Sequence, residues 1–332
     1  MGGIQERPGP AAVSTGTDMK ALVIGLGSIG RRQASLLAGR KGIELRAFRS
    51  DPRSGPNDLG LPEMRDWSEA SRWAPFAAFI CNPTYLHLET ARRCAELGCP
   101  LFIEKPLGAA REGLDELLEV VGRRGIATYV AYNLRFHPVI ERLRQWAGEH
   151  PVLHARIVCT SHLGLWRPAA APLKTYSAYR SQGGGAMLDL SHELDYADWI
   201  LDGITKIDGR LGRRGRVTED AEDCVDLLLE GRRGWADVHL NVLSHQRQRT
   251  IQIDAEDMTV AGDLVDASLS SFHHHELVEK TDYGLAIQDT YDRQIDYFLA
   301  HIDDPRMMNN VFAAAELLRK MIGFKDAHEP SE

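Results

Sequence analysis

The sequence predicts an α/β protein, with a doubly wound parallel sheet in its N-terminal part and a helix-backed open sheet in a second, α+β domain. From residue 20 to about residue 130, short apolar segments alternate with helical ones, the pattern of a parallel sheet with helices on both faces. Farther along, several segments carry apolar residues at every second position in part, as a one-faced antiparallel sheet does. With 332 residues, 43% of them apolar, the chain can fill two hydrophobic cores.

The composition excludes several classes of protein. The formal net charge is −8, and no run of Lys or Arg is long enough to follow a nucleic-acid backbone, so we expect no nucleic acid as partner. No segment reaches the roughly 18 uninterrupted apolar residues of a membrane span. Residues 1–18 also lack the apolar core of a secretory signal, so we expect a cytoplasmic protein without membrane contact.

We expect no disulfide and no metal site. The five cysteines are scattered and include no C-x-x-C pair, which favours reduced thiols. His273, His274 and His275 are consecutive, and consecutive residues of an extended chain point to opposite faces, so they cannot easily bind one metal together.

The elements of the N-terminal part follow the alternation. Residues 1–18, rich in Gly, Pro, Ser and Thr, predict a disordered leader, so the fold begins near Met19. The expected strands are Ala21–Ile24, Ile43–Phe48, Phe76–Cys81 and Pro100–Ile103. One helix is expected after Gly30 and another over Leu86–Leu97. Ligands of such sheets bind beyond the carboxyl ends of the strands, so Gly25–Gly30, Asn82–Thr84 and Glu104–Pro106 should line one crevice.

A glycine-rich turn follows the first strand. In KALVIGLGSIGRRQASL, Gly25, Gly27 and Gly30 form a G-x-G-x-x-G pattern between an apolar strand and an apolar helix face. Such a turn leaves free backbone N–H groups at a helix N-terminus, where they suit a pyrophosphate. We therefore expect this turn, with Ser28 and Ile29, to bind a dinucleotide, although an ordinary glycine turn has the same letters.

The end of the second strand bears on the choice of nicotinamide cofactor. An acidic side chain at this point binds the ribose 2′-hydroxyl of NAD, and a basic one accommodates the 2′-phosphate of NADP. Here the strand ends in Phe48-Arg49-Ser50-Asp51, and Arg49 with Ser50 could hold a phosphate. We favour NADP; the alternative is NAD, with Asp51 reaching the ribose from a solvated basic loop.

In the second half of the chain, the regular alternation of strands and helices ends. The expected elements are a helix over Val139–Trp146, strands over Val152–Cys159, Cys224–Leu229, Trp235–Leu243 and Thr250–Asp254, and helices over Ala286–Ile302 and Val311–Phe324. The segment Asp303-Asp304-Pro305 separates the last two helices.

The segment GGGAMLDLSHELDY, residues 183–196, is expected to open a helix. Met187, Leu190 and Leu194 recur at helical intervals and form its buried stripe, while Asp189 and His192 share another face. A carboxylate beside a histidine can fix its tautomer and raise its basicity, as proton transfer near neutral pH requires. A plain ion pair on a helix surface has the same spacing.

Together these motifs resemble the Gfo/Idh/MocA oxidoreductases. The resemblance rests on GLGSIGRR (25–32), FICNPTYLH (79–87), EKPL (104–107), YNLRFHP (132–138) and GGGAMLDLSHELDY (183–196). It implies a Rossmann domain over residues 19–131, a second domain with a large, mainly antiparallel open sheet over 132–324, and a tail over 325–332. It also implies that Asn82, Pro83, Thr84, His87, Glu104 and Lys105 join the turn residues in binding cofactor.

The resemblance implies a catalytic Lys, Asp and His, which by motif are Lys105, Asp189 and His192. Members commonly place the histidine four residues after the aspartate, whereas the interval here is three, as in a branch associated with sugar and sugar-nucleotide pathways. Glu193 is an alternative contributor.

The expected reaction is reversible hydride transfer between NADP(H) and a carbinol or keto carbon of a sugar, sugar acid or nucleotide sugar. His192 is the expected acid/base, Asp189 orients it, and Lys105 binds the reacting oxygen or relays the proton. The alternatives are a glycosidase that keeps its NAD bound through oxidation and elimination, and a nucleotide-sensing regulator without turnover.

Substrate contacts are expected from the second domain. Besides His192, the candidates are Tyr132, Asn133, Arg135, Trp166, Arg167, Tyr176, Tyr179 and Arg180. Aromatic and guanidinium groups suit a sugar or an anionic group, so the arginines favour an anionic substrate. An exposed sheet face would need cover, so we expect a homodimer or homotetramer.

Overall fold

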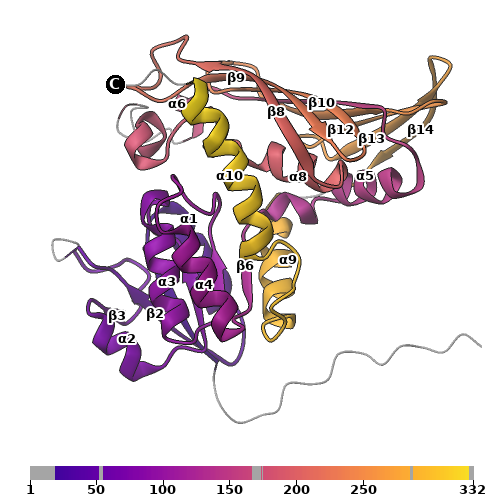
Figure 1. Cartoon of the computed structure of the whole chain (residues 1–332). Coiled ribbons are helices and arrows are strands. Elements are labelled where there is room, and N and C mark those ends of the chain that lie inside the picture. The colour runs from indigo at the N-terminus through magenta and orange to yellow at the C-terminus, as the bar shows by residue number, and fades with distance from the viewer. Residues whose placement is uncertain (1–18, 52–54, 167–172, 174, 285–286, 329–332) are drawn as a thin grey trace, which may run out of the picture.

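The structure, a computed structural model, describes residues 19–51, 55–166, 173, 175–284 and 287–328, so the expected leader, residues 1–18, lies outside the described part. Two sheets form the framework of the molecule (Figure 1). The first sheet and its helices lie below, the second sheet lies above, and the C-terminal helix runs between them. The described residues include no helix with the length and apolar character needed to cross a membrane.

The first sheet has six parallel strands in the order β3-β2-β1-β4-β5-β6. They are β1 (Met19–Ile24), β2 (Ile43–Phe48), β3 (Glu63–Met64), β4 (Ala77–Ile80), β5 (Leu101–Ile103) and β6 (Thr128–Val130). Helices α1 (Ser28–Ala38), α2 (Trp67–Trp73), α3 (His87–Glu96) and α4 (Leu114–Arg124) connect them. All four residues of β4 are buried, as expected for a strand covered on both faces. The predicted doubly wound sheet is confirmed, and its strand order reverses between β1 and β4.

The second sheet has eight strands in the order β14-β13-β12-β11-β7-β10-β9-β8. They are β7 (His154–Thr160), β8 (Ile204–Gly212), β9 (Cys224–Gly231), β10 (Gly234–Asn241), β11 (Gln248–Asp254), β12 (Thr259–Asp263), β13 (Ser268–His273) and β14 (Glu276–Asp282). Neighbours are antiparallel except β7 and β10. Side chains alternate along β10: Val238 is buried toward the helices, and Trp235 is 67% exposed on the other face. The predicted open sheet is confirmed.

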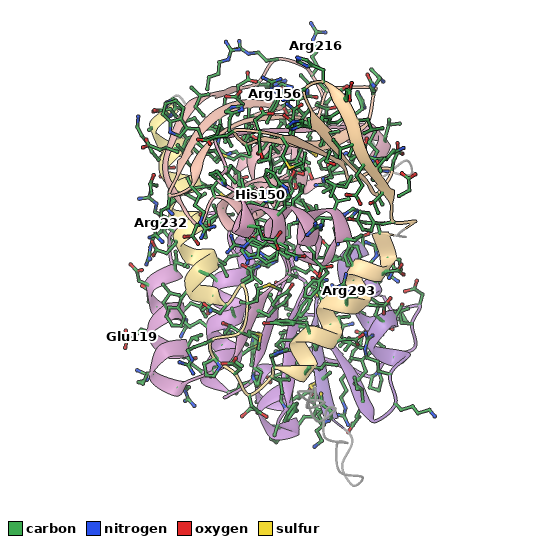
Figure 2. All side chains as sticks on the ribbon, turned by 90° about the vertical axis from the view of Figure 1, so that its right-hand side faces the viewer. Glu119, His150, Arg156, Arg216, Arg232 and Arg293 are labelled. Atoms are coloured by element: carbon green, nitrogen blue, oxygen red, sulfur yellow. The ribbon has the colours of Figure 1, made fainter. Side chains whose placement is uncertain are left out.

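Helices α5 (Pro138–Glu149) and α8 (His192–Ile200) pack on the inner face of this sheet (Figure 1). The outer face carries Arg156, which Figure 2 labels on the upper sheet. Strands β8, β12, β13 and β14 of this sheet were not predicted from the sequence. Every residue of β14 is exposed or half-buried, so its sequence, ELVEKTD, lacks the full apolar alternation that marks a strand with a buried face.

The last two helices tie the halves together. Helix α9 (Ile287–Ala300) returns to the first sheet, where Phe298 packs edge-on against Phe79 and Phe102 with centroids 5.6 Å apart. Asn309 then exchanges hydrogen bonds with Val130 of β6. The division at residues 131 and 132 therefore assigns to the second domain a helix that completes the core of the first.

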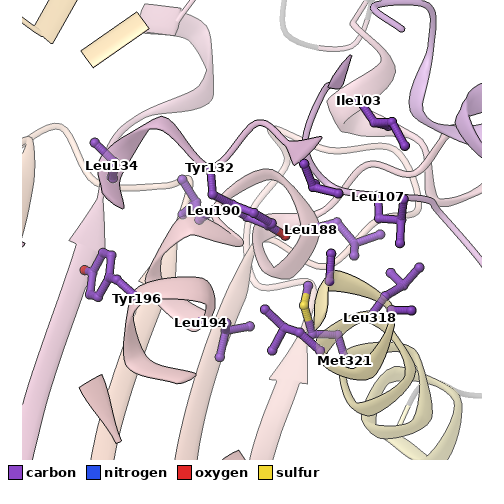
Figure 3. Close-up of a cluster of buried hydrophobic side chains, with 14 of the residues drawn as sticks. Ile103, Leu107, Tyr132, Leu134, Leu188, Leu190, Leu194, Tyr196, Leu318 and Met321 are labelled. Atoms are coloured by element: carbon purple, nitrogen blue, oxygen red, sulfur yellow. The ribbon is translucent and has the colours of Figure 1, made fainter. Parts of the chain in front are cut away.

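Helix α10 (Val311–His328) continues past the predicted end at Phe324. Lys325, expected in a tail, is buried, and its ammonium donates to Glu222 Oε2 at 2.5 Å. Figure 3 shows Leu318 and Met321 of α10 packed beside Leu188 and Leu194, so one apolar cluster extends across both halves.

The segment 183–196 does not form one helix. Helix α7 (Ala186–Asp189) ends, Leu190 and Ser191 form a turn, and α8 begins at His192. The expectation of a continuous helix is therefore wrong, because two short helices are enough to bury the apolar side chains of this segment. Asp189 and His192 consequently lie on different helices.

Nor does the histidine tract run as an extended strand. His274 and His275 have φ values of 48° and 69° and form the two-residue turn between β13 and β14. The rings of His273 and His274 lie 4.0 Å apart. The expectation that these residues lie on an extended chain and point to opposite faces is therefore wrong for His274 and His275. The absence of a metal stays a prediction.

A buried ion pair fixes α8 to the segment before α5. Arg135, in the short helix η2 (Asn133–Phe136), donates to both carboxylate oxygens of Asp195 at 2.9 and 2.8 Å. The side chains of Arg135 and Asp195 are only 9% and 3% exposed, and the guanidinium lies 5.0 Å from the Trp199 ring.

We expect Asp195→Ala to lower the free energy of unfolding by about 3 to 5 kcal/mol, because it leaves a buried guanidinium without its carboxylate. The control is Asp296→Ala, which removes the 67%-exposed partner of Arg40 and should cost no more than about 1 kcal/mol. Urea titration followed by circular dichroism measures both. Equal effects of the two substitutions would contradict the assignment of Arg135–Asp195 as a buried, stabilising pair.

Candidate active site

A cleft of about 800 Å³ lies at the carboxyl ends of β1, β2, β4 and β5. Its lining joins the three segments predicted to converge, because Gly25–Ile29, Asn82–Thr84 and Glu104–Lys105 all border it. The second half of the chain adds four side chains, namely those of Asn133, Tyr176, His192 and Tyr291.

The glycine turn has the shape of a cradle for a pyrophosphate. Gly25 has a φ of 88°, and a Cβ there would lie 2.7 Å from Asn82 Cα. A Cβ on Gly30 would lie 1.9 Å from the Gly25 carbonyl oxygen, so α1 can approach the turn only because residue 30 is glycine. Gly27 has open space on its Cβ side at the N-terminus of α1. A dinucleotide fits this arrangement, since its phosphates can approach bare backbone N–H groups.

Arg49 lies at the end of β2 and borders the cleft with Ser50 and Asp51. Its guanidinium already has partners: Nη2 donates to the Gly55 carbonyl at 2.5 Å, and Nε lies 3.5 Å from Glu63 Oε2. Arg65 approaches the same Glu63 carboxylate at 3.0 Å. The cleft thus ends in a basic group that a carboxylate partly balances.

Sequence reasoning missed two further residues at this end of the cleft. Trp67 of α2 and Arg93 of α3 border it, and the Arg93 guanidinium lies 5.6 Å from the Trp67 ring. Trp67 also packs on Phe48, with ring centroids 4.4 Å apart. No motif marks these positions, because α2 and α3 meet only in the folded chain.

His87 joins two of the converging segments. Its Nε2 lies 2.9 Å from the Asn82 carbonyl oxygen and its Nδ1 lies 2.9 Å from the Pro106 carbonyl oxygen. The ring is buried, and this burial lowers the pKa of His87 below its ordinary value. His87 borders the cleft and holds the turns after β4 and β5 together.

Lys105 follows β5 and crosses to the second half of the molecule. Its Nζ donates to the Asp189 backbone carbonyl at 2.6 Å. Burial lowers the pKa of Lys105, and the negative charge of Asp189 acts in the opposite direction. Asp189 itself is buried and does not border the cleft.

His192 borders the same cleft as Lys105. Its Nδ1 is buried and has no hydrogen-bond partner among the described residues, and its ring meets Tyr132 edge-on at 5.5 Å. Burial lowers the pKa of His192 well below its ordinary value, and the nearby Lys105 and Arg249 cations lower it further. The expected rise in basicity is therefore wrong, because these cations and burial outweigh a carboxylate that lies on another helix. Burial and the two cations thus favour the neutral form of the imidazole.

Glu193 does not enter the cleft. Its carboxylate is fully buried and accepts from Arg249 Nε at 2.7 Å and Nη2 at 3.2 Å. This pair joins the first turn of α8 to β11. Glu193 thus holds α8, and with it His192, against the second sheet.

The structure separates the predicted substrate residues into groups. Asn133, Tyr176 and His192 border the cleft, and the Asn133 amide donates to Thr290 Oγ1 at 2.6 Å. Arg135 does not border the cleft, because its side chain is buried against Asp195. Arg167 lies outside the described residues.

Three more predicted substrate residues lie away from the cleft lining. Trp166 donates to Ser161 Oγ at 3.0 Å and packs on the hydrophobic core. The Tyr179 hydroxyl donates to the Leu173 carbonyl at 2.9 Å, and the backbone N–H of Arg180 donates to Asp220. The first two contacts lie within the segment before α7, and the third joins that segment to the one before β9.

Tyr291 was not predicted. It reaches the cleft from α9, and the Arg32 guanidinium lies 4.5 Å from its ring. The sequence around Tyr291 reads as an ordinary amphipathic helix, so only the return of α9 to the first sheet reveals it.

Cys224, Asp226 and His239 gather on the outer face of the second sheet, with donor atoms within 4.8 Å of one another. Asn241 Oδ1 accepts from the Leu243 and Ser244 backbones, so its Nδ2 faces His239 Nε2 at 2.9 Å. His239 Nδ1 therefore carries the proton and donates to Asp226 Oδ1 at 2.6 Å. Both ring nitrogens are already used in hydrogen bonds, and we assign this cluster no metal.

Comparison with known proteins agrees with the geometry. Residues 19–132 match the model of the Gfo/Idh/MocA family, described as an oxidoreductase family with an NAD-binding Rossmann fold. The chain is 22% identical over 209 residues to 2,7-anhydro-N-acetylneuraminate hydratase of Mediterraneibacter gnavus, covering 60% of this chain and 55% of that protein. It is 28% identical over 209 residues to scyllo-inositol 2-dehydrogenase (NAD(+)) of Bacillus subtilis, covering 58% and 56%. The alignments thus span about half the length of these relatives.

Solved structures share the fold over nearly the whole chain. Levoglucosan dehydrogenase in complex with NADH superposes with a TM-score of 0.80 at 16% identity, covering 93% of this chain and 96% of that one. UDP-N-acetylglucosamine 3-dehydrogenase from Acidithiobacillus ferrooxidans superposes with a TM-score of 0.76 at 20% identity, covering 94% and 98%. At these identities the likeness concerns the fold.

We expect Gly30→Ala to destabilise the protein by about 1 to 3 kcal/mol, because its Cβ would overlap the Gly25 carbonyl oxygen. Gly27→Ala is the matched control: its Cβ meets nothing within 4 Å, so its cost should stay below about 1 kcal/mol. Thermal unfolding of the two variants measures the difference. Equal melting temperatures would contradict the tight approach of α1 to the turn.

Proposed function

We propose that the chain is a member of the Gfo/Idh/MocA oxidoreductases and acts as a nicotinamide-dependent dehydrogenase or reductase of a sugar, sugar acid or nucleotide sugar. One observation carries the proposal. A single cleft is bordered both by a glycine cradle for a dinucleotide and by Lys105 and His192. Relatives named for inositol and for N-acetylated sugars support a polyol or sugar-like substrate.

Two side chains are proposed to act on the reacting hydroxyl. The cofactor, held by the glycine turn and the segment after β4, supplies hydride chemistry when bound. The Lys105 ammonium stabilises the negative charge that develops on the substrate oxygen. Burial and the nearby cations favour the neutral form of His192, and its Nδ1 is buried, so we propose that Nε2 takes the hydroxyl proton.

Asp189 is proposed to position Lys105 rather than to orient His192. Its backbone oxygen fixes the ammonium, and its charge favours the protonated lysine. The division of labour thus differs from a carboxylate–histidine pair. Asp189 supports the cation and His192 moves the proton.

We expect Lys105→Met to lower kcat about 100- to 1,000-fold, as loss of one preorganised group facing a developing oxyanion does. Steady-state kinetics with the true substrate measures it, and near-normal turnover would contradict the role. The variant should still bind the reduced dinucleotide, whose nicotinamide ring is uncharged, and equilibrium titration checks this.

Asp189→Asn is expected to move the alkaline limb of kcat/KM to lower pH. Removing the carboxylate removes a charge that raises the pKa of Lys105, so the ammonium deprotonates at lower pH and activity is lost there. The control is Asp58→Asn, which neutralises a carboxylate that is 70% exposed and should not move the limb. A lower rate with an unmoved limb would show that Asp189 acts only on structure.

NADP is proposed as the preferred cofactor, with NAD as the alternative. Arg49 borders the cleft where the adenosine ribose of a dinucleotide would end, and a 2′-phosphate could compete with Glu63 for its guanidinium. Trp67 and Arg93 offer an adenine-binding surface beside it.

We expect Arg49→Ala to weaken NADP binding at least tenfold, the loss of about 1.4 kcal/mol of charge-assisted hydrogen bonding. Binding of NAD should change far less. Titration of both dinucleotides, with Arg72→Ala on the exposed side of α2 as control, separates the cases. Equal affinity for the two dinucleotides, unchanged in Arg49→Ala, would exclude the phosphate site.

Two other functions stay as alternatives. A redox-elimination enzyme keeps its cofactor bound and unchanged overall, and the hydratase among the relatives supports it. A nucleotide-sensing regulator turns nothing over, and the presence of Lys105 and His192 in the cleft favours an enzyme. A homodimer or homotetramer through the outer face of the second sheet, where Leu228 and Trp235 are exposed, stays a prediction.

A further inference from the structure

Glu104 is a buried carboxyl group on the floor of the cleft. It directly follows β5 and borders the cleft beside Lys105, yet only 6% of it is exposed. Its Oε1 accepts from Gln33 Nε2 of α1 at 2.6 Å, and Gln33 is fully buried. The mechanism proposed above leaves this side chain without a role.

Within the described part of the chain, no cation neutralises Glu104 by direct contact. The Lys105 ammonium is engaged with the Asp189 carbonyl, and the Arg32 guanidinium stacks on Tyr291. The Glu104 carboxylate therefore relies on hydrogen bonds from the Gln33 amide and the Lys105 backbone N–H. A buried carboxylate with so few favourable contacts is stabilised by any further positive charge that is brought close to it.

The groups facing Glu104 come from every surrounding element. Besides Gln33, they are Lys105 on the same loop, Arg32 on α1, Cys81 after β4, Tyr129 on β6 and Tyr291 on α9. Burial raises the pKa of Glu104 to about 7, against the lowering effect of Gln33, Lys105 and Arg32. Burial also raises the pKa of Cys81, Tyr129 and Tyr291, so these three stay neutral at pH 7.

We infer that Glu104, held by Gln33, selects the oxidation state of the bound cofactor: its carboxylate favours the positively charged, oxidised nicotinamide over the neutral, reduced one. The inference rests on the proposed function, since it needs a nicotinamide in this cleft. It goes further, because it assigns a control of redox balance to a residue outside the hydride and proton transfer. The oxidised ring carries a positive charge that the reduced ring lacks, so only the oxidised form gains from a nearby carboxylate.

The charge of Glu104 makes this preference depend on pH. Below pH 7 the carboxyl group is mostly protonated and discriminates little; above pH 7 it is ionised and favours the oxidised form. By linkage, the oxidised cofactor lowers the pKa of Glu104 and releases its proton. The affinity ratio of oxidised over reduced cofactor should therefore rise as the pH rises from 6 to 8.5.

The test is equilibrium binding of NADP and NADPH, and of NAD and NADH, to the whole protein without substrate. Calorimetry follows the oxidised forms and nicotinamide fluorescence the reduced ones, at pH 6, 7, 8 and 8.5. For the dinucleotide pair that binds more tightly, we expect the oxidised-over-reduced affinity ratio to rise roughly 5- to 50-fold over this range. In Glu104→Gln the ratio should be low and independent of pH.

Two variants separate charge from structure. Gln33→Met keeps the carboxylate and removes the hydrogen bond that stabilises it, so the rise in the ratio should move to higher pH. Glu119→Gln removes a carboxylate of α4 that is 73% exposed and should behave as the unmodified protein (Figure 2). If Glu104→Gln does not fold, the displaced midpoint in Gln33→Met still tests the inference.

The possible results are distinct. A pH-independent ratio in the unmodified protein, or an unchanged rise in Glu104→Gln, overturns the inference and leaves the proposed function standing. Absence of binding by all four dinucleotides overturns the proposed function itself.

Discussion

The hydrogen bond from the Lys105 ammonium to the Asp189 carbonyl is the interaction on which the arrangement of the cleft depends. It joins the loop after β5 to the end of α7, residues 84 positions apart in the chain. A largely buried ammonium requires an acceptor, and α7 must therefore end where its last carbonyl meets that group. The same contact places His192, three residues later, on the wall that the second half of the chain contributes to the cleft.

Buried ion pairs outside the cleft hold this wall, formed by α7 and α8, in place. Arg135 binds Asp195 and Arg249 binds Glu193, so α8 is joined to η2 and to β11. Lys325 of α10 binds Glu222, which in turn accepts a hydrogen bond from the Met187 backbone of α7. Breaking one such pair leaves a buried charge without a partner, so the pairs oppose displacement of α7 and α8. These paired charges thus support the site without entering it.

Burial also sets the electrostatics of the cleft. It lowers the pKa of Lys105 and His192 and raises the pKa of Glu104 to about 7. All three shifts reduce the cost of keeping ionisable groups away from water, and together they bring the cleft groups closer to neutrality. An incoming charged ring or a developing alkoxide therefore meets groups whose charge state it can change, which links cofactor binding, proton transfer and pH.

The parts of the structure that rest on local rules were predictable from the sequence. The apolar run Ile43–Phe48 is a strand with those bounds, and Gly25, Gly27 and Gly30 form the predicted turn, because strand burial and glycine backbone freedom act within a few residues. The motifs also placed Lys105 and His192 in one cleft. Tertiary structure alone decided the break after Asp189, the burial of Arg135 against Asp195, and the arrival of Tyr291 from α9. These outcomes depend on partners 60 or more residues away, whose desolvation and charge no local pattern records.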